Sequence, residues 1–273
     1  MSGEYAGKVA LVTGGGTGIG AATAGLLRRL GAHVIVMGPD HDALAEVASA
    51  TGAVPVVGDA ADAGDCDTAV AIARDRWDRL DTLIGCAGIG TFGTVLDTTP
   101  EAWRRVLHVN LDTAHVAARS CLPLLMSGGG AIVLVSSLAG TAAVPGSAAY
   151  VTSKHALIGL VRSLSADFGP YGVRANAVCP GLVRTDMADL VMDTLGRPAG
   201  LDRTQAYARA TGLSPLRRAA EPAEIAEVIA FLAGPRSAVI TGAVLMADCG
   251  VSAVDLSLSA LTTTSPSLED TCD

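Results

Sequence analysis

Short apolar segments alternate with longer segments of helical periodicity along nearly the whole chain. The apolar segments are rich in Val, Ile and Ala and span residues 8–13, 34–37, 54–57, 82–86, 131–136, 174–178 and 244–247. Apolar residues at helical spacing lie between them, over residues 21–30, 41–50, 65–78, 100–126, 151–168 and 221–233. Strands separated in this way need crossover connections, so they lie parallel in one sheet with helices on both faces. The sequence therefore predicts an α/β fold, with a doubly wound parallel sheet of about seven strands flanked by helices.

Composition narrows the class of protein. Of the 273 residues, 50% are hydrophobic and 17% are charged, so one large core of Ala, Val, Leu and Ile can form. The formal net charge of −8 argues against nucleic acid or an anionic membrane surface as a partner. Six scattered cysteines without a CxxC pair predict reduced thiols and no metal site. The N-terminus lacks a signal-like pattern, and no apolar run approaches about 18 residues, so we expect a cytoplasmic protein.

A glycine-rich loop, TGGGTGIG at residues 13–20, joins the first predicted strand to the first predicted helix. Glycines let the backbone approach a pyrophosphate, and the helix that follows offers free N–H groups and a favourable dipole. An ordinary tight turn is the alternative, and the flanking strand and helix argue against it. The loop predicts a dinucleotide site in a single Rossmann-like domain, with candidate contacts at Gly14, Thr17, Gly18, Ile19 and Gly20.

The choice between NAD and NADP is expected to depend on residues 38–41, where the second predicted strand ends. A 2′-phosphate is usually bound by Arg or Lys, and neither occurs here or in the glycine loop. Asp40 is placed to accept a hydrogen bond from a ribose 2′-hydroxyl and to repel a phosphate, so NAD is preferred and NADP is the alternative. Asp59, after the third strand, is a candidate for the adenine amino group, or else a loop cap.

Tyr150 and Lys154 are four residues apart, which places them on one face of a helix. A free phenol has a pKa near about 10, and a nearby ammonium favours the phenolate and lowers that pKa. The pair can therefore carry a proton transfer, although an exposed tyrosine and a solvated lysine would give the same spacing. The glycine loop and the serine pair Ser136-Ser137 upstream favour proton transfer.

In combination these motifs resemble the short-chain dehydrogenase/reductase family over nearly all of residues 6–250. The features that carry the resemblance are Gly14, Gly18 and Gly20 in the loop, Cys86-Ala87-Gly88, Asn110, Ser136-Ser137, Tyr150 with Lys154, and Pro180-Gly181.

The resemblance implies an oxidoreductase that transfers a hydride between a nicotinamide cofactor and a secondary alcohol or ketone. Tyr150 would be the general acid/base, Lys154 would lower its pKa and bind the nicotinamide ribose, and Asn110 would anchor a water. Ser137, which has the family's usual separation from the tyrosine, would hold the substrate oxygen, and Ser136 would be a strand-end residue. Further cofactor contacts would be Ala87, Gly88, Pro180, Gly181, Val183 and Thr185, and Thr185 has the alternative of capping the next helix.

Three positions depart from the family pattern. Gly85 stands where the family usually has Asn, and a loss of local rigidity is the expected consequence. Cys249 stands where the family usually has Gly, so it would be strained if that position needs a positive φ. At Gly38 the acidic residue common in NAD users is missing. Two other functions stay open: epimerisation or elimination on the same fold, and a non-catalytic nucleotide sensor.

The chain is expected to hold one catalytic domain, residues 1–251, followed by a C-terminal tail, residues 252–273. Residues 183–214, with several Gly and Pro between short helical pieces, are expected to cover the substrate. Leu138, Val144, Leu182 and Met187 suggest an apolar pocket for a small alcohol or ketone. Apolar residues in segments 100–126 and 151–168, together with the resemblance, predict a homo-oligomer, with a tetramer as the expected state.

Overall fold

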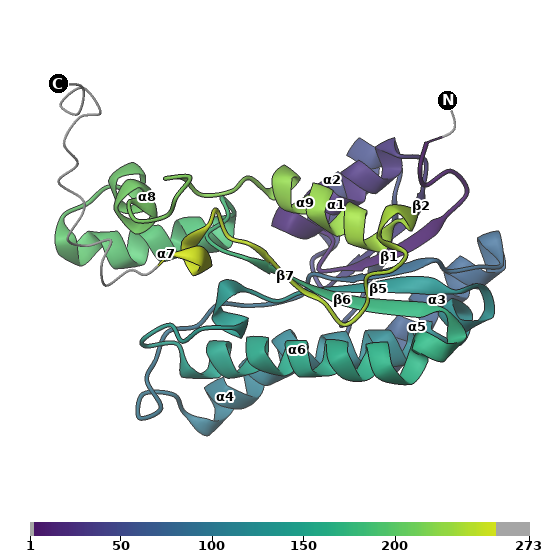
Figure 1. Ribbon diagram of the computed structural model, residues 1–273, viewed down its shortest axis with the longest axis horizontal. Coiled ribbons are helices and arrows are strands. Elements are labelled where there is room, and N and C mark those ends of the chain that lie inside the picture. The colour runs from purple at the N-terminus through teal and green to yellow at the C-terminus, as the bar shows by residue number, and fades with distance from the viewer. Residues whose placement is uncertain (1–2, 255–273) are drawn as a thin grey trace, which may run out of the picture.

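Seven parallel strands form one sheet in the computed structural model, which describes residues 3–254 (Figure 1). The order β3-β2-β1-β4-β5-β6-β7 confirms the predicted doubly wound α/β fold. The strands are β1 (Val9–Thr13), β2 (His33–Gly38), β3 (Val54–Val57), β4 (Thr82–Gly85), β5 (Gly130–Val135), β6 (Val173–Pro180) and β7 (Val244–Ala247). The helices are α1 (Gly18–Arg29), α2 (His41–Thr51), α3 (Ala63–Trp77), α4 (Pro100–Leu107), α5 (Thr113–Gly128), α6 (Ala148–Phe168), α7 (Asp186–Gly196), α8 (Arg203–Thr211) and α9 (Pro222–Ala233).

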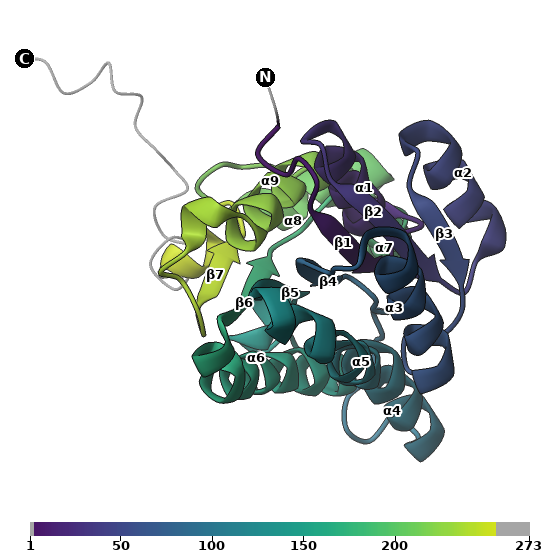
Figure 2. The same ribbon diagram turned by 90° about the vertical axis from the view of Figure 1, so that its right-hand side faces the viewer.

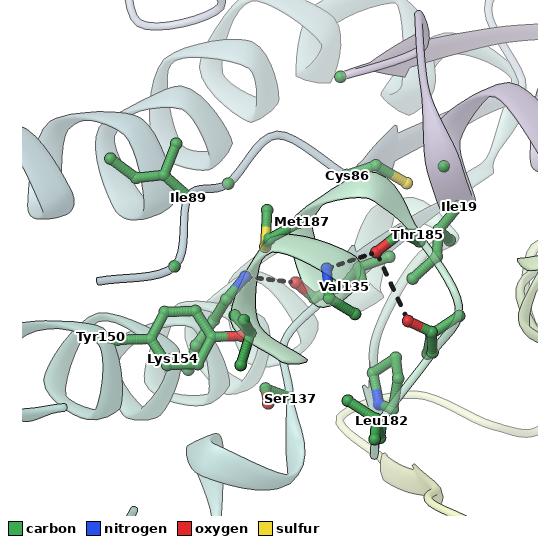
Figure 3. A pocket seen from close by; sticks show the side chains of 18 of the residues that line it. Ile19, Cys86, Ile89, Val135, Ser137, Tyr150, Lys154, Leu182, Thr185 and Met187 are labelled. Atoms are coloured by element: carbon green, nitrogen blue, oxygen red, sulfur yellow. Dashed lines mark hydrogen bonds between the residues drawn. The ribbon is translucent and has the colours of Figure 1, made fainter. Parts of the chain in front are cut away.

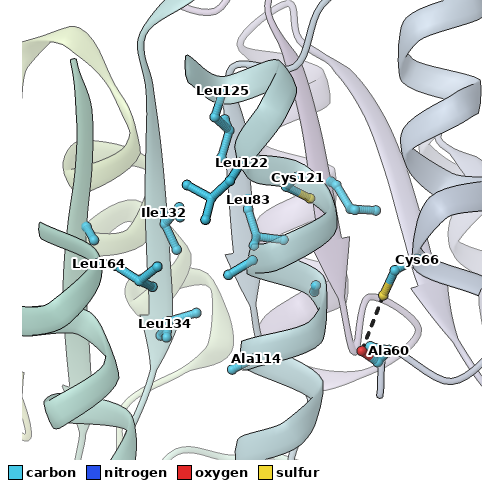
Figure 4. Packing of buried hydrophobic residues seen from close by; sticks show 14 of the residues in the cluster. Ala60, Cys66, Leu83, Ala114, Cys121, Leu122, Leu125, Ile132, Leu134 and Leu164 are labelled. Atoms are coloured by element: carbon cyan, nitrogen blue, oxygen red, sulfur yellow. Dashed lines mark hydrogen bonds between the residues drawn. The ribbon is translucent and has the colours of Figure 1, made fainter. Parts of the chain in front are cut away.

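Helices cover both faces of the sheet (Figure 2). On one face α1, α2 and α9 enclose a core that includes Val12 and Val133. On the other face α3, α5 and α6 enclose a second core that includes Leu11 and Ile132 (Figure 4). Neighbouring strand residues serve opposite cores because successive side chains point to opposite faces, which explains the uninterrupted apolar segments of the sequence. None of the helices within residues 3–254 has both the length and the apolar character that a membrane crossing requires.

The strand order reverses direction between β1 and β4. β2 and β3 lie on one side of β1, whereas β4, β5, β6 and β7 extend the sheet on the other. Thr13 pairs with Gly85 in the register of β1 and β4, so the two strands end at the same level. A crevice forms outside the carboxyl ends of parallel strands at such a reversal, and ligands of α/β proteins bind there. The loops after β1 and β4 begin at this crevice.

The segment predicted as one helix over residues 100–126 is interrupted. α4 ends at Leu107, a π-helical turn spans His108–Asp112, and α5 begins at Thr113. A π-helical turn adds one residue to the helix and is often found at functional sites. Apolar periodicity does not reveal it, because the helical pattern continues on either side.

Residues 183–214 form a helical layer beyond the carboxyl ends of the strands, where α7 and α8 lie in Figure 1. The two helices pack around Met192 and Tyr207. Arg203 on α8 lies 2.9 Å from Asp189 and 2.6 Å from Asp193, both on α7. These ion pairs join α7 and α8 into one unit. Residues 255–273 of the predicted tail lie outside the described residues.

Candidate active site

The loop between β1 and α1 is folded so closely that its glycines are required. Gly14 has a φ of +64°, and a β-carbon built on it would lie 2.6 Å from the Ala87 nitrogen. A β-carbon on Gly20 would lie 2.0 Å from the Gly14 oxygen. Thr17 is the N-cap of α1, yet its hydroxyl makes no capping hydrogen bond and the first turn carries no acidic residue. The loop therefore presents bare backbone and helix N–H groups, which fit a dinucleotide pyrophosphate.

A cavity of about 430 Å³ opens beside this loop (Figure 3). Its wall contains most of the predicted site residues: Gly14, Thr17, Gly18, Ile19, Gly20, Ala87, Gly88, Ser137, Tyr150, Lys154, Pro180, Gly181, Val183 and Thr185. Three predicted residues are not part of the wall: Asn110, Asp40 and Asp59. The fold thus brings the predicted hydroxyl, phenol and ammonium groups to one cavity beside the glycine loop.

Tyr150 lies in the first turn of α6 and contributes its phenol to the cavity wall. Burial raises the pKa of Tyr150 above its usual value, and the polar Ser137 side chain offsets part of that rise. The Ser137 hydroxyl, directly after β5, also accepts a hydrogen bond from the Ala139 nitrogen at 3.1 Å. The phenol is therefore protonated at neutral pH, so that it and Ser137 can both donate hydrogen bonds to one oxygen in the cavity.

Lys154 lies one turn after Tyr150 on α6, with its Nζ 5.7 Å from the centre of the tyrosine ring. Its ammonium donates a hydrogen bond to the Val135 carbonyl at 3.0 Å (Figure 3). Burial lowers the pKa of Lys154 to about 8. A β-carbon on Gly88 would lie 3.3 Å from Nζ, so glycine keeps this side of the ammonium open.

The pKa of Tyr150 differs from the sequence prediction. The YxxxK spacing predicts a lowered value, but the structure gives a raised one. The reason is that burial disfavours the phenolate more than its neighbours favour it.

Asn110 lies in the π-helical turn and is only 1% exposed. Its Oδ1 accepts from the Ile89 nitrogen at 2.7 Å, and its Nδ2 donates to the Ile89 carbonyl at 3.0 Å and to Ser153 Oγ at 2.9 Å. These bonds tie the loop after β4 to α6, the helix that carries Tyr150 and Lys154. The amide therefore fixes the position of two walls of the cavity, and its role in anchoring a water stays a prediction.

The two predicted adenosine contacts lie outside the cavity wall. Asp40 is the N-cap of α2, where its Oδ1 accepts from the Asp42 and Ala43 nitrogens at 3.0 and 3.1 Å. Asp59 Oδ1 accepts from a backbone N–H two residues on at 2.9 Å, and Asp59 Oδ2 lies 3.2 Å from His108 Nε2. Each carboxylate thus has a structural partner, and the contacts to ribose and adenine stay predictions.

Thr185 links the covering layer to the glycine loop. It is the N-cap of α7, and its hydroxyl accepts a hydrogen bond from the Ala188 nitrogen at 3.3 Å (Figure 3). Thr185 therefore caps the next helix, which was the alternative to a cofactor contact. A β-carbon on Gly18 would lie 3.1 Å from the Thr185 methyl group. The start of α7 therefore closes over the N-terminus of α1.

Several cavity residues were not found by sequence reasoning. They are Ile89, Gly90, Thr91 and Phe92 in the loop after β4, and Ser147 at the start of α6. The only sequence signal of the loop is that it follows a predicted strand at its carboxyl end. Asp186 and Val191 also line the cavity and belong to residues 183–214, which were expected to cover the substrate. Of the four residues expected in an apolar pocket, Val144, Leu182 and Met187 line the cavity and Leu138 does not.

The departures from the family pattern have structural counterparts. A β-carbon on Gly85 would lie 2.7 Å from Leu134 Cδ2, so the neighbouring strand takes the space of a side chain. The Thr13 hydroxyl, on the register partner of Gly85, is buried and has no hydrogen-bond partner within residues 3–254. Cys249 has a φ of 57°. Its position thus requires a positive φ, and we infer that the cysteine backbone is strained there, as expected from the sequence.

A family profile described as "Enoyl-(Acyl carrier protein) reductase" matches residues 14–252 of the chain. The chain belongs to the short-chain dehydrogenase/reductase family, and the class of protein is an oxidoreductase that transfers a hydride between an alcohol or ketone and a nicotinamide cofactor.

The chain is similar to several individual proteins over nearly its whole length. The chain is 43% identical to "Protein MoaE" of Klebsiella aerogenes, over 91% of this chain and 97% of the relative. It is 36% identical to a trans-4-hydroxycyclohexanecarboxylate dehydrogenase of Sinomonas cyclohexanicum, over 93% and 96%. The solved structure of an aldohexose dehydrogenase of Thermoplasma acidophilum superposes with a TM-score of 0.84 at 28% identity, over 93% of this chain and 96% of that one.

Proposed function

We propose that the chain is an NAD-linked dehydrogenase/reductase of an uncharged secondary alcohol or ketone, with Tyr150 as its general acid/base. The observation that carries the proposal is the cavity itself, in which Tyr150, Ser137 and Lys154 lie beside the glycine loop. The nicotinamide supplies or accepts the hydride when it is bound. Ser137 and Tyr150 hold the substrate oxygen, and Tyr150 Oη gives its proton to that oxygen during reduction or takes it back during oxidation.

The two other functions make different predictions. A non-catalytic nucleotide sensor would bind the cofactor without turnover of any alcohol or ketone. An epimerase or lyase would convert substrate without net change in the absorbance of the reduced cofactor. Measuring that absorbance across a panel of alcohols and ketones with both cofactors separates the dehydrogenase from the other two functions, and turnover of the cofactor supports the dehydrogenase. Analysis of the substrate for conversion then separates an epimerase or lyase from a sensor.

The apolar part of the cavity wall supports an uncharged, largely apolar substrate. It includes Phe92, Val144, Leu182, Met187 and Val191. Within the described residues, the only ammonium in the wall is that of Lys154, and the only carboxylate is that of Asp186. An anionic group on the substrate would find no cation in the wall other than Lys154, which disfavours its burial. We propose that residues 183–214 cover the substrate on this side.

We expect NAD to be preferred over NADP by at least about tenfold in kcat/KM, equivalent to about 1.4 kcal/mol. No Arg or Lys occurs in residues 13–20 or 38–41, and Asp40 and Asp42 place negative charge at the start of α2. A 2′-phosphate would therefore lack a cation and be repelled. Steady-state kinetics with both cofactors on one alcohol measure the preference.

A double substitution tests which residues set this preference. Pro39→Arg with Asp40→Ser supplies a cation, removes a carboxylate and keeps a capping hydroxyl for α2. We expect it to move the preference towards NADP. Equal kcat/KM values for the two cofactors in the wild type would show that Asp40 does not contact the adenosine ribose. An unchanged preference in the double variant would show that this ribose does not lie against residues 38–41.

We also propose that the protein is a cytoplasmic homotetramer. β7 is an edge strand of the sheet, Leu245 on it is exposed, and Val239 just before it is 95% exposed. Exposed apolar residues beside an unpaired strand edge are typical of surfaces that a further subunit covers. Sedimentation at micromolar concentration is expected to show a tetramer, and a monomer would contradict the proposal.

The state of the cysteines supports the cytoplasm as the compartment. The five described cysteines are free thiols, which fits a reducing compartment.

A further inference from the structure

Ser147 is a buried serine in the cavity wall whose hydroxyl is unused by the protein. The residue is 5% exposed and lies three residues before Tyr150. Ser147 pairs with Gly93 in an isolated parallel bridge between the loop after β4 and the start of α6, but its hydroxyl makes no hydrogen bond within residues 3–254. The residue is almost fully buried, but Ser147 Oγ is not among the buried atoms that lack a partner, so the protein does not enclose this oxygen and it opens to the cavity. A hydroxyl held in this way is free to bond a ligand.

The position of Ser147 in the chain makes the unused hydroxyl more informative. Ser147 is the N-cap of α6, and serine is favoured there because its hydroxyl accepts a hydrogen bond from an N–H of the first turn. That bond is absent, and the residue has φ −140° and ψ 44°, outside the extended conformation usual for a capping residue. Helix capping therefore does not explain why this residue is serine.

The surrounding backbone holds Ser147 in place without help from its side chain. The Gly93 nitrogen donates to the Gly146 carbonyl at 2.7 Å, and the Ala148 nitrogen donates to the Gly93 carbonyl at 3.1 Å. These two bonds fasten the loop after β4 to the start of α6 on either side of Ser147. The hydroxyl is therefore carried by a fixed backbone, a turn away from the residue that handles the proton.

The cavity wall limits the kind of group that Ser147 can bind. Its apolar members include Phe92, Val144, Leu182 and Met187, whose side chains offer no hydrogen bond apart from the weak acceptor sulfur of methionine. A hydroxyl both donates and accepts hydrogen bonds and carries no charge, so it suits a carbonyl or hydroxyl group. A carboxylate would need a cation, and the only one in the wall within the described residues is Lys154.

We propose that Ser147 is a specificity-determining residue, which recognises a second, uncharged oxygen on the substrate while Tyr150 and Ser137 hold the first. The substrate class is then a neutral hydroxyketone, diketone or diol on a mainly hydrocarbon framework. This inference rests on the proposed function, since it assigns the first oxygen to Tyr150 and Ser137.

The test compares ketones that differ only in the second oxygen. The pairs are 3-hydroxy-2-butanone with 2-butanone, and 1,4-cyclohexanedione with cyclohexanone, the latter corrected for two equivalent carbonyls. In the wild type we expect kcat/KM for the oxygenated member of at least one pair to exceed that of its partner by about tenfold or more. In Ser147→Ala we expect most of that ratio to be lost, because only the oxygenated ketone loses a partner.

Two measurements separate recognition from a structural role. Thr152→Val removes a hydroxyl from the same helix at an exposed position, where it donates to the Ala148 carbonyl, and it should keep the wild-type ratio. Because the Ser147 hydroxyl caps nothing, the Tm of Ser147→Ala should stay within about 2 °C of the wild type.

Each outcome has a distinct meaning. A wild type without preference in either pair, or a Ser147→Ala variant that keeps the preference, would overturn the inference while leaving the proposed function intact. Failure of the wild type to reduce any of these ketones with either cofactor would count against the proposed function, and the inference would fall with it.

Discussion

Tyr150→Phe is expected to lower kcat by about a thousandfold while leaving cofactor affinity essentially unchanged. The variant keeps the aromatic ring that packs in the first turn of α6 and loses only the hydroxyl that exchanges a proton with the substrate. Turnover is followed by the absorbance of the reduced cofactor, and the Kd of the cofactor by fluorescence titration. Wild-type rates in this variant would remove Tyr150 from the mechanism.

A matched control is available in Tyr171, an exposed tyrosine at the end of the turn that follows α6. Tyr171→Phe removes the same atom far from the cavity wall, and we expect wild-type kinetics. A loss of activity in both variants would point to a general effect on the fold instead of proton transfer.

The raised pKa of Tyr150 predicts that ketone reduction and alcohol oxidation depend differently on pH. Because burial raises that pKa, the phenol is protonated at neutral pH and ready to donate during ketone reduction. Alcohol oxidation needs the phenolate, so its rate should increase by about tenfold for each pH unit on the acidic side of the pKa. Rate profiles of both directions between neutral and alkaline pH show the asymmetry, and oxidation that is independent of pH over this range would contradict it.

The fold could be predicted from the sequence because both faces of the sheet are buried. Most strands are short apolar runs such as residues 9–13, and the helices are longer amphipathic stretches, so the alternation is visible without any contact information. The glycine loop was equally visible, since the close approaches at Gly14 and Gly20 permit no side chain.

Other parts of the site could not be predicted because they depend on tertiary contacts. The π-helical turn holds Asn110 against Ile89 and Ser153, three elements far apart in the chain. Ser147 lies before the helix predicted over residues 151–168, so the sequence does not single it out, and only the structure shows it as an N-cap residue whose hydroxyl caps nothing. The sign of the Tyr150 pKa shift likewise depends on burial, which the YxxxK spacing does not contain.

Lys154→Met is expected to impair both binding and chemistry. The ammonium lies beside the open side of Gly88 and one turn from Tyr150, and we propose that it contacts the cofactor ribose and acts electrostatically on the phenol. We expect a rise in the cofactor Kd of about tenfold, the value of one charged hydrogen bond, and a fall in kcat of about a hundredfold. Lys8→Met, at a half-exposed lysine paired with Asp81, is the control and should leave both quantities unchanged.

The same substitution should not destabilise the fold at neutral pH, which distinguishes it from ordinary core damage. Burial lowers the pKa of Lys154 from 10.5 to about 8, so below pH 8 the folded protein holds a charge that the unfolded chain solvates better. That shift corresponds to a cost of about 3 kcal/mol, an order-of-magnitude value. Met removes this cost, but it leaves the Val135 carbonyl without its donor. The unpaired carbonyl destabilises the variant by about 1–3 kcal/mol, which offsets much of the gain.

The sign of the pH dependence follows from the direction of the shift. Between pH 8 and 10.5 the unfolded chain binds the Lys154 proton more tightly than the folded protein does, so the wild type gains stability from this group as pH rises. Lys154→Met lacks that gain. We therefore expect the variant to melt no lower than the wild type at pH 7, and the wild type to improve relative to it by pH 9.5. Thermal melts at both pH values measure the difference, and a variant that is much less stable at pH 7, with the same deficit at pH 9.5, would show that the buried ammonium carries no such cost.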